Sequence, residues 1–193
     1  MARQKEFDSD EVLHKAMEVF WARGYERTSI QDLVKHMGIN RQSIYDTFGD
    51  KHSLFLQALD RYRETQSRRV FEILDRPGSV KRNFKLLFQE AVDKSLSEEG
   101  RRGCFLGNAM SELAGHCQET AGRTCNSVAS AERTFQRALQ RGRERGELSA
   151  VRDTRAVARF LYSSLQGLIL LGKGTRDRQL LTDIVKVTLS VLD

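Results

Sequence analysis

Proline occurs only once in this chain of 193 residues, at Pro77, and this scarcity is the strongest constraint on its fold. A proline inside a helix removes a backbone hydrogen bond and clashes with the preceding turn, so long helices can form on both sides of residue 77. The residues that are abundant elsewhere, Ala, Leu, Arg, Glu and Gln, have high helix propensity. The sequence therefore predicts an all-α protein.

Capping residues predict three short helices near the start of the chain. Each opens at a side chain that can accept a backbone N–H and ends at a glycine, which is the usual pattern at the two ends of a helix. Asp50 then caps a fourth, longer helix. The three short helices, with their caps and glycines, are 9–23 (Asp8 with Glu11, then Gly24), a second opened by Thr28 with Gln31 (then Gly38), and a third opened by Asn40 (then Gly49).

The second and third of these helices have the form of a helix-turn-helix unit, whose second helix enters the major groove of DNA. The turn at residues 38–40 is short and contains a glycine. At the start of the third helix, Arg41, Gln42 and Ser43 are predicted to point outward. Their side chains can form hydrogen bonds to base edges, and we predict that they bind DNA.

Net charge does not locate a DNA-binding face. The whole chain carries a formal charge of +6, but residues 1–51 carry 8 Lys+Arg against 9 Asp+Glu, a balance of −1. The prediction of DNA binding therefore depends on the geometry of the motif.

The sequence around this motif resembles the N-terminal domain of TetR-family transcriptional regulators. The resemblance rests on residues 16–30 (AMEVFWARGYERTSI), 33–34 (LV), 38–39 (GI) and 43–51 (SIYDTFGDK). It implies an all-α homodimer whose C-terminal body binds an inducer and changes the spacing of two DNA-reading heads. It also implies that Thr28, Tyr45 and Lys51 contact the DNA backbone, with a hydroxyl at a helix start, a phenol and a positive charge.

The resemblance predicts how the chain is divided into three segments and which partners it binds. We expect a DNA-binding head over residues 1–51, a connecting helix over about 51–76, and a ligand-binding and dimerisation body over 77–193. The expected partners are a double-stranded DNA operator, a second copy of the chain and a small-molecule inducer. A palindromic operator would match the two-fold symmetry of a homodimer. We predict a sequence-specific repressor that an inducer releases.

Two helices near the end of the chain, about 154–172 and 178–192, are apolar over more than one face, whereas a surface helix needs only one apolar stripe. They follow helices predicted over about 80–96, 103–114 and 121–145. Two interpretations fit the excess: deep core within one chain, or core on one side and a homodimer four-helix interface on the other. We prefer the second, with Ser164, Leu168, Leu181 and Ile184 in the interface.

A ligand pocket is expected between the middle helices of the body. The residues that suit its wall suit a plain hydrophobic core equally well, and the sequence leaves that alternative open. They are Phe88, Phe105, Met110, Phe135 and Tyr162.

Cys104 is a candidate sensor. It follows Arg101 and Arg102 at a predicted helix start, and nearby positive charge and a helix N-terminus both favour the thiolate. The segment Gly-Cys-Phe-Leu-Gly-Asn at 103–108, with Glu112 after it, also resembles a branch of the TetR family in which that cysteine senses electrophiles or oxidants. A buried inert thiol explains Cys104 as well. Covalent modification of Cys104 is therefore the alternative to a reversible inducer.

Other classes of protein are disfavoured. No apolar run approaches the ~20 residues of a membrane span, and the first residues lack the apolar region of a secretory signal, so we expect a cytoplasmic protein without membrane contact. Residues 167–174 follow a P-loop for seven positions, but Gly174 replaces the Ser or Thr. Cys117 and Cys125 with His116 lack the spacing of a zinc site. We expect no cofactor, metal or enzymatic activity; an ATP-using enzyme and a purely structural helical module are the alternatives.

Overall fold

The computed structural model describes residues 7–148, 151 and 153–193, and the predicted absence of a signal peptide falls partly on residues 1–6, outside these ranges. Helices account for all the regular structure in the described ranges, as expected for an all-α protein. Their bounds are α1 Ser9–Arg23, α2 Ile30–Met37, α3 Arg41–Phe48, α4 Lys51–Leu74, α5 Val80–Leu96, α6 Phe105–Leu113, α7 Gln118–Glu144, α8 Thr154–Gly172 and α9 Arg178–Leu189, with short 3-10 helices at Glu99–Arg102 and Ser190–Leu192.

Three of the predicted caps begin their helices as expected. The carboxylate of Asp8 accepts the backbone N–H of Glu11 at the start of α1, and Asn40 and Asp50 cap α3 and α4 in the same way. Glu11 does not complete the predicted box with Asp8, because its carboxylate pairs with Lys15 at 2.7 Å. The local signals that place α1, α3 and α4 are therefore confirmed.

The start of α2 differs from the prediction. Ser29 caps α2, and it forms a reciprocal capping box with Asp32, in which each side chain accepts the backbone N–H of the other residue. Thr28 is buried and donates its hydroxyl hydrogen to the carbonyl oxygen of Gly24 at 2.6 Å. The predicted box of Thr28 with Gln31 is wrong because the Thr28 hydroxyl closes the turn after α1 instead.

Two hydrophobic cores divide the molecule. The first joins α1, α2 and α3 to the beginning of α4 as far as Tyr62, and it also contains Phe105, Ala109 and Leu113 of α6. These three residues recur every four positions, so one face of α6 packs on the head. The second core lies among α5, α7, α8, α9 and the end of α4. The predicted division at residues 51 and 77 therefore cuts through the first core.

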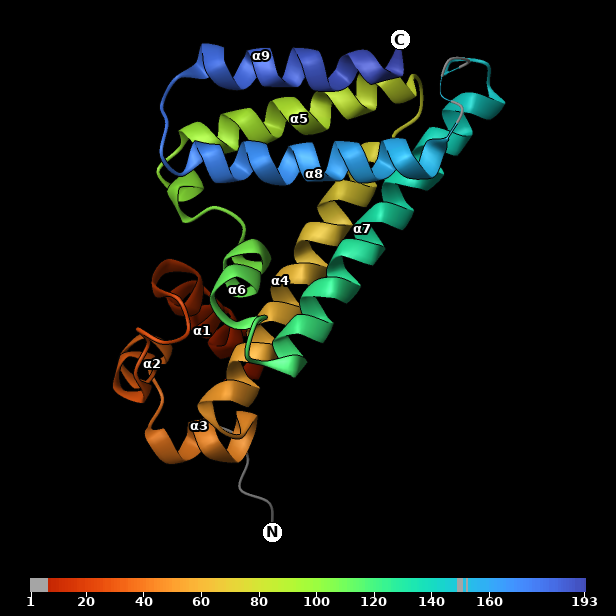
Figure 1. The fold of residues 1–193 in the computed structure, drawn as a ribbon. Helices are drawn as coiled ribbons and strands as arrows, with labels where there is room; N and C mark the ends of the chain where they lie inside the picture. The colour runs from red at the N-terminus through yellow and green to blue at the C-terminus, as the bar shows by residue number, and fades with distance from the viewer. Residues whose placement is uncertain (1–6, 149–150, 152) are drawn as a thin grey trace.

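Long helices connect the two cores. Figure 1 shows α5, α8 and α9 side by side at one end of the molecule, while α4 and α7 run together from that end to the head, with α6 beside them. Because α4 has 24 residues, it contributes to both cores without a break. A change in the body can therefore reach the head through packed helices.

The segment that resembles a P-loop, residues 167–174, forms the end of α8 and the turn after it. A phosphate-binding loop wraps its backbone around the phosphate, which a helical segment cannot do. Over the described ranges, no helix has both the length and the apolar character needed to cross a membrane.

Candidate DNA-reading head and ligand cavity

The helix α3 presents polar side chains to solvent because its apolar ones are fixed in the first core. Ile44 and Phe48 are buried there. Arg41 and Gln42 are exposed, and Tyr45 is partly exposed. Side chains able to reach base edges therefore stand at the start of the helix that follows the turn, where a helix-turn-helix reader places them.

Neighbours on α3 hold these side chains in defined positions. The Arg41 guanidinium donates to the hydroxyl of Tyr45 at 3.2 Å and lies over its ring, 5.5 Å from the centroid. The Gln42 amide donates to Asp46 at 2.7 Å. Ser43, partly exposed, donates its backbone N–H to Asn40 at 2.8 Å. Ordered side chains lose less conformational freedom when they bind, which favours recognition.

Of the residues expected at the DNA backbone, Lys51 and Thr28 differ in exposure. Lys51 is the first residue of α4 and is partly exposed. Its ammonium group lies 4.2 Å from the centre of the Tyr25 ring. Thr28 is 1% exposed, and its hydroxyl is already bonded to Gly24. In this conformation Thr28 cannot reach a phosphate, and Ser29 is the exposed hydroxyl residue at the start of α2.

A cavity of about 640 Å³ lies behind the head, among α4, α5, α7 and α8. This volume is within the range of small-molecule sites, roughly 300–1,000 Å³. Burial, with a smaller effect of Cys104, raises the pKa of Tyr162 to about 12, and the same causes raise the pKa of Tyr62 well above the usual range of a phenol. Both phenols remain protonated at neutral pH and can donate hydrogen bonds to a ligand.

Two of the residues predicted to line the pocket, Phe135 and Tyr162, border this cavity, and so does the candidate sensor Cys104. Phe88 and Phe105 are at most 1% exposed and belong to the second and first core, so their assignment to the pocket is wrong. Their rings fill the contacts between helices and leave no free face for a ligand. Met110 lies instead beside a second cavity of about 800 Å³, which shares Cys104 and Tyr162 with the first.

Cys104 is the N-cap of α6 and borders both cavities. Its sulfur accepts a backbone N–H of the first turn at 3.5 Å, and the side chain is partly exposed. The two arginines, expected beside the Cys104 thiol, have other partners. Arg101 pairs with Glu98, and Arg102 lies over the ring of Trp21. Cys104 thus lies at the N-terminus of α6, and both arginines have partners other than its sulfur.

The other end of α6 is bonded to the turn after α1. The carboxylate of Glu112 accepts the backbone N–H of Tyr25 at 3.1 Å and that of Glu26 at 2.9 Å. Gly24 makes this approach possible, because a Cβ atom at that position would lie 2.9 Å from Oε2 of Glu112. The link joins the body to the head. Nothing in the sequence points to it beyond the place of Glu112 after the segment 103–108, which resembles one branch of the TetR family.

Two of the predicted dimer-interface residues belong to the interior of a single chain. Leu168 and Leu181 are at most 1% exposed in the second core, so placing them in an interface is wrong, while Ser164 and Ile184 are partly exposed. Leu168 and Leu181 are buried because α8 and α9 pack against α5 and against each other. The helices α8 and α9 nevertheless carry more apolar residues than the second core buries. Large apolar side chains that remain exposed on α8 and α9 are Phe160, Leu170, Leu171, Leu180 and Val187.

One cluster of chemically active side chains was not found from the sequence. His52 of α4 lies against Cys117 and Glu119 at the start of α7. By sequence alone, Cys117 is grouped with Cys125 and with its neighbour His116, which is exposed. Cys117 and His52 are separated by sixty-five positions in the chain. No local spacing signals a contact between residues so far apart.

Comparison with known proteins gives matches over nearly the whole chain. Residues 12–58 match the model of bacterial regulatory proteins of the tetR family, and residues 71–187 match the tetracyclin repressor-like C-terminal domain. The chain is 43% identical to an uncharacterized HTH-type transcriptional regulator of Bacillus subtilis (strain 168), YezE, over 100% of both chains. It is 31% identical to the HTH-type transcriptional repressor ComR of Escherichia coli (strain K12), over 97% of this chain and 90% of that one.

A solved structure extends the similarity to the fold. It is a triple cysteine mutant of the TetR-family regulator CifR, complexed with 26-bp double-strand operator DNA. The TM-score is 0.84 at 32% sequence identity, and the match covers 98% of each chain.

Proposed function

The chain belongs to the TetR family of bacterial transcriptional regulators, and we propose that it is a homodimeric repressor that binds a palindromic operator and is released by a small molecule. The observation that carries this proposal is the exposed start of α3, where Arg41 and Gln42 stand directly after the turn. Relatives named as repressors and a similar regulator solved on operator DNA support it. The regulator acts in the cytoplasm, where operator DNA lies.

We assign different roles to the side chains of the head. Arg41 and Gln42 read bases, because Arg can form a bidentate contact with guanine and Gln with adenine. Each such contact contributes ~1–3 kcal/mol of discrimination against the wrong base. Ser43, Tyr45 and Lys51 contact the DNA backbone and set the register of α3 in the groove. The two roles differ in their consequence, since backbone contacts carry no direct sequence information.

A second copy of the chain covers the exposed apolar face of α8 and α9. Leu170 and Val187 are 65% and 70% exposed, values that are unfavourable for large apolar side chains unless a partner buries them. Ser163 and Gly167 lie on the exposed side of α8 and allow another helix to approach closely. An isologous four-helix contact would place two heads about a two-fold axis, matching a palindromic operator.

The switch operates through α6. A ligand in the cavity meets the Cys104 end of α6, and Glu112 near the other end is bonded to the turn between α1 and α2. A ligand needs only to bind better to the conformation in which the two α3 helices no longer fit successive major grooves. The protonated phenols of Tyr62 and Tyr162 lie in a wall that also holds Arg63, Arg69 and Lys94, and they suit a ligand with a hydrogen-bond acceptor.

Covalent modification of Cys104 is the second candidate for the signal. Cys104 lines both cavities, so an electrophile or oxidant that enters either one meets this residue. A modified Cys104 would add bulk at the start of a packed helix, where even one extra methylene is felt. As with a reversible ligand, the modification would act on the operator through α6.

Selection of genomic fragments with the purified protein tests the function. We expect a palindromic sequence to be enriched, and we expect enrichment to disappear for a double variant with alanine at Arg41 and Gln42. The enriched site then serves for measuring affinity by fluorescence anisotropy. Failure to enrich any sequence, with a folded and dimeric protein, would overturn the proposal.

A further inference from the structure

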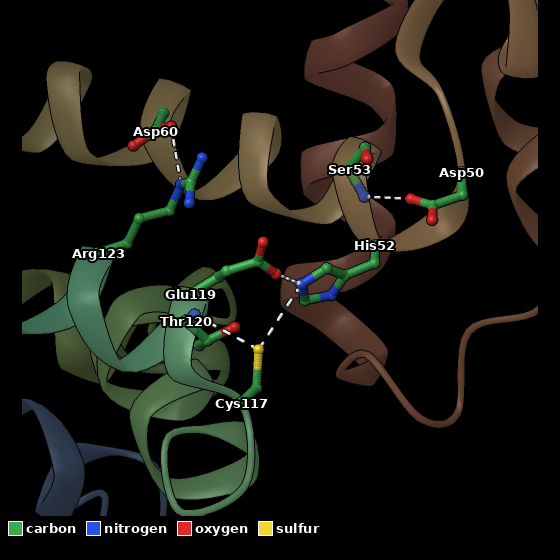
Figure 2. A network of polar contacts seen from close by, with 8 residues as sticks. All are labelled: Asp50, His52, Ser53, Asp60, Cys117, Glu119, Thr120 and Arg123. Atoms are coloured by element: carbon green, nitrogen blue, oxygen red, sulfur yellow. Dashed lines mark hydrogen bonds and ion pairs between the residues drawn. The ribbon is translucent and has the colours of Figure 1, made fainter.

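Three metal-ligating side chains meet where the first turn of α4 lies against the first turn of α7, as Figure 2 shows. His52 comes from α4, and Cys117 and Glu119 come from the start of α7. Nε2 of His52 lies 2.8 Å from Oε2 of Glu119 and 3.6 Å from Sγ of Cys117. All three ligand atoms lie within 4.8 Å of one another, so a single ion can contact them together.

The spacing suits a tetrahedral ion. With bonds of about 2.3 Å to sulfur and 2.0–2.1 Å to nitrogen, a tetrahedral zinc ion separates these two ligand atoms by about 3.6 Å. The observed distance between Cys117 Sγ and His52 Nε2 is 3.6 Å. Glu119 is now closer to His52 than an ion would allow, but its side chain is 66% exposed and can withdraw by the few tenths of an ångström required.

The chemistry of the donors selects the class of ion. A thiolate, an imidazole and a carboxylate form a mixed sulfur, nitrogen and oxygen set, which suits Zn²⁺ and neighbouring divalent transition ions. Mg²⁺ and Ca²⁺ prefer oxygen ligands alone. Three protein ligands leave a fourth position for water, which is the arrangement of an open site rather than of a closed structural one.

The surroundings prepare two of the ligands. The backbone N–H of Thr120 donates to Sγ of Cys117 at 3.4 Å, and the buried Thr120 hydroxyl, which has no other partner among the described residues, lies beside the sulfur. These two groups lower the pKa of Cys117 below its ordinary value. The ring of Tyr25 packs edge-on against His52, with centroids 5.7 Å apart, and restricts its orientation.

The location of the site links the head to the body. His52 directly follows Lys51, which we place at the DNA backbone, and α4 begins just after α3 ends. Farther along the same two helices, Arg123 and Asp60 form an ion pair at 3.1 Å. An ion bound by His52, Cys117 and Glu119 would add a second, stronger link between α4 and α7 beside the recognition helix.

We propose that His52, Cys117 and Glu119 bind one divalent transition ion of the Zn²⁺ class, with water as the fourth ligand, and that its occupancy changes the affinity for the operator. The binding site rests on the geometry of this cluster alone. The effect on operator affinity rests on the proposed function as well. The two parts are therefore tested separately.

The site is tested with untagged, reduced, full-length protein and Co²⁺ as a spectroscopic substitute for Zn²⁺. We expect one ion per chain, with thiolate-to-cobalt charge-transfer absorption that Zn²⁺ removes. Cys117→Ser keeps a capping oxygen for α7, so it should fold, and it should lose the absorption. His52→Gln should weaken binding by more than the roughly 10–100-fold typical of losing an outer-shell partner.

Cys125→Ser is the matched control, because Cys125 is an exposed thiol on the same helix, and it should bind the ion as the parent does. Absence of thiolate absorption in the parent, or its equal loss in Cys125→Ser, would overturn the site. For the second part, operator affinity is measured with Zn²⁺ and with a chelator. We expect a change of roughly 5–150-fold, a common size for coupling between two sites, in the parent and none in Cys117→Ser.

An operator affinity that is the same with Zn²⁺ and with chelator would overturn the coupling and leave the ion site standing. A protein that binds the ion but no operator under either condition would instead overturn the proposed function. The two failures are thus distinguishable.

Discussion

The indole Nε1 of Trp21 donates a buried hydrogen bond to the carbonyl oxygen of Gly103, 3.0 Å away. Trp21 belongs to α1 of the head, and Gly103 directly precedes Cys104, the cap of α6. Together with the Glu112 carboxylate near the other end, this bond ties α6 to the head at both ends. Under the proposed function, a displacement of Cys104 would therefore be transmitted to the elements that orient α3.

Replacing Glu112 with glutamine should weaken this link. The amide keeps one acceptor but turns a donor toward a backbone N–H, so we expect a loss of roughly 1–3 kcal/mol in the free energy of unfolding. The effect of inducer on operator affinity should fall at the same time. Chemical denaturation and anisotropy titration measure the two effects. Glu98→Gln, at an exposed ion pair with Arg101, is the control and should change stability by less than about 0.5 kcal/mol.

Alanine substitutions in the head should separate base reading from backbone contact. Arg41→Ala and Gln42→Ala should each weaken operator binding by ~1–3 kcal/mol and relax preference at one base pair. Lys51→Ala should weaken binding to operator and random DNA alike and reduce the salt dependence. Competition titrations with single-base operator variants measure both. Equal losses on operator and random DNA for all three variants would contradict the assigned roles.

Charged substitutions should distinguish the dimer face from the interior of the body. Val187→Glu lies on the exposed face, so we expect a folded monomer by sedimentation at micromolar concentration. Leu168→Glu places a charge in the second core and should unfold the body, because an unpaired buried charge costs roughly 3–5 kcal/mol. Circular dichroism separates the two results. A monomeric parent chain would refute the predicted dimer.

Serine at Cys104 should separate covalent from reversible switching. If the thiol is the sensor, Cys104→Ser binds operator normally and no longer responds to an electrophile, while Cys125→Ser responds like the parent. Intact mass spectrometry of the treated protein identifies the modified residue, and anisotropy measures release. A Cys104→Ser variant that still responds to the same compound would leave the reversible ligand as the signal.

Acid should remove the contribution of the Ser29–Asp32 capping box. The Ser29 hydroxyl and backbone N–H, with a smaller effect of Arg23, lower the pKa of Asp32 to about 2 in the folded chain. The unfolded value is about 3.9, so the stabilisation is complete above that pH and is lost as the pH falls through 2. We expect Asp32→Asn to be less stable than the parent at pH 7, with the difference shrinking toward pH 2.

Denaturant titrations of both proteins at stepped pH values measure this difference. A difference in stability that stays constant from pH 7 to pH 2 would contradict the role of the ionised carboxylate.

Most helices and the helix-turn-helix unit could be predicted from the sequence because they depend on neighbours in the chain. Asp8, Asn40 and Asp50 cap the helices that follow them, and each bonds to a backbone N–H no more than three residues away. Periodic apolar residues likewise identify the buried face of a helix without reference to its partner. The exposure of Arg41 and Gln42 follows from the burial of Ile44 and Phe48 on the same helix.

Short-range alternatives are harder to separate. Thr28 and Ser29 both suit a helix cap, and the choice of Ser29 depends on the Thr28 hydroxyl bonding back to Gly24. The apolar residues of α8 also fit two partners equally well. Only the packing of α8 on α5 and α9 assigns Leu168 to the core and leaves Leu170 exposed.

By itself, the sequence determined the helices, most of their caps and the presence of a DNA-reading motif, because these depend on interactions within a few residues. Only the tertiary structure decided which side chains meet across the molecule. The bonds from Trp21 to Gly103 and from the Tyr25 backbone to Glu112, and the meeting of His52 with Cys117, each join residues more than sixty positions apart. Such contacts depend on how α1, α4, α6 and α7 pack around shared cores, which no spacing within one helix specifies.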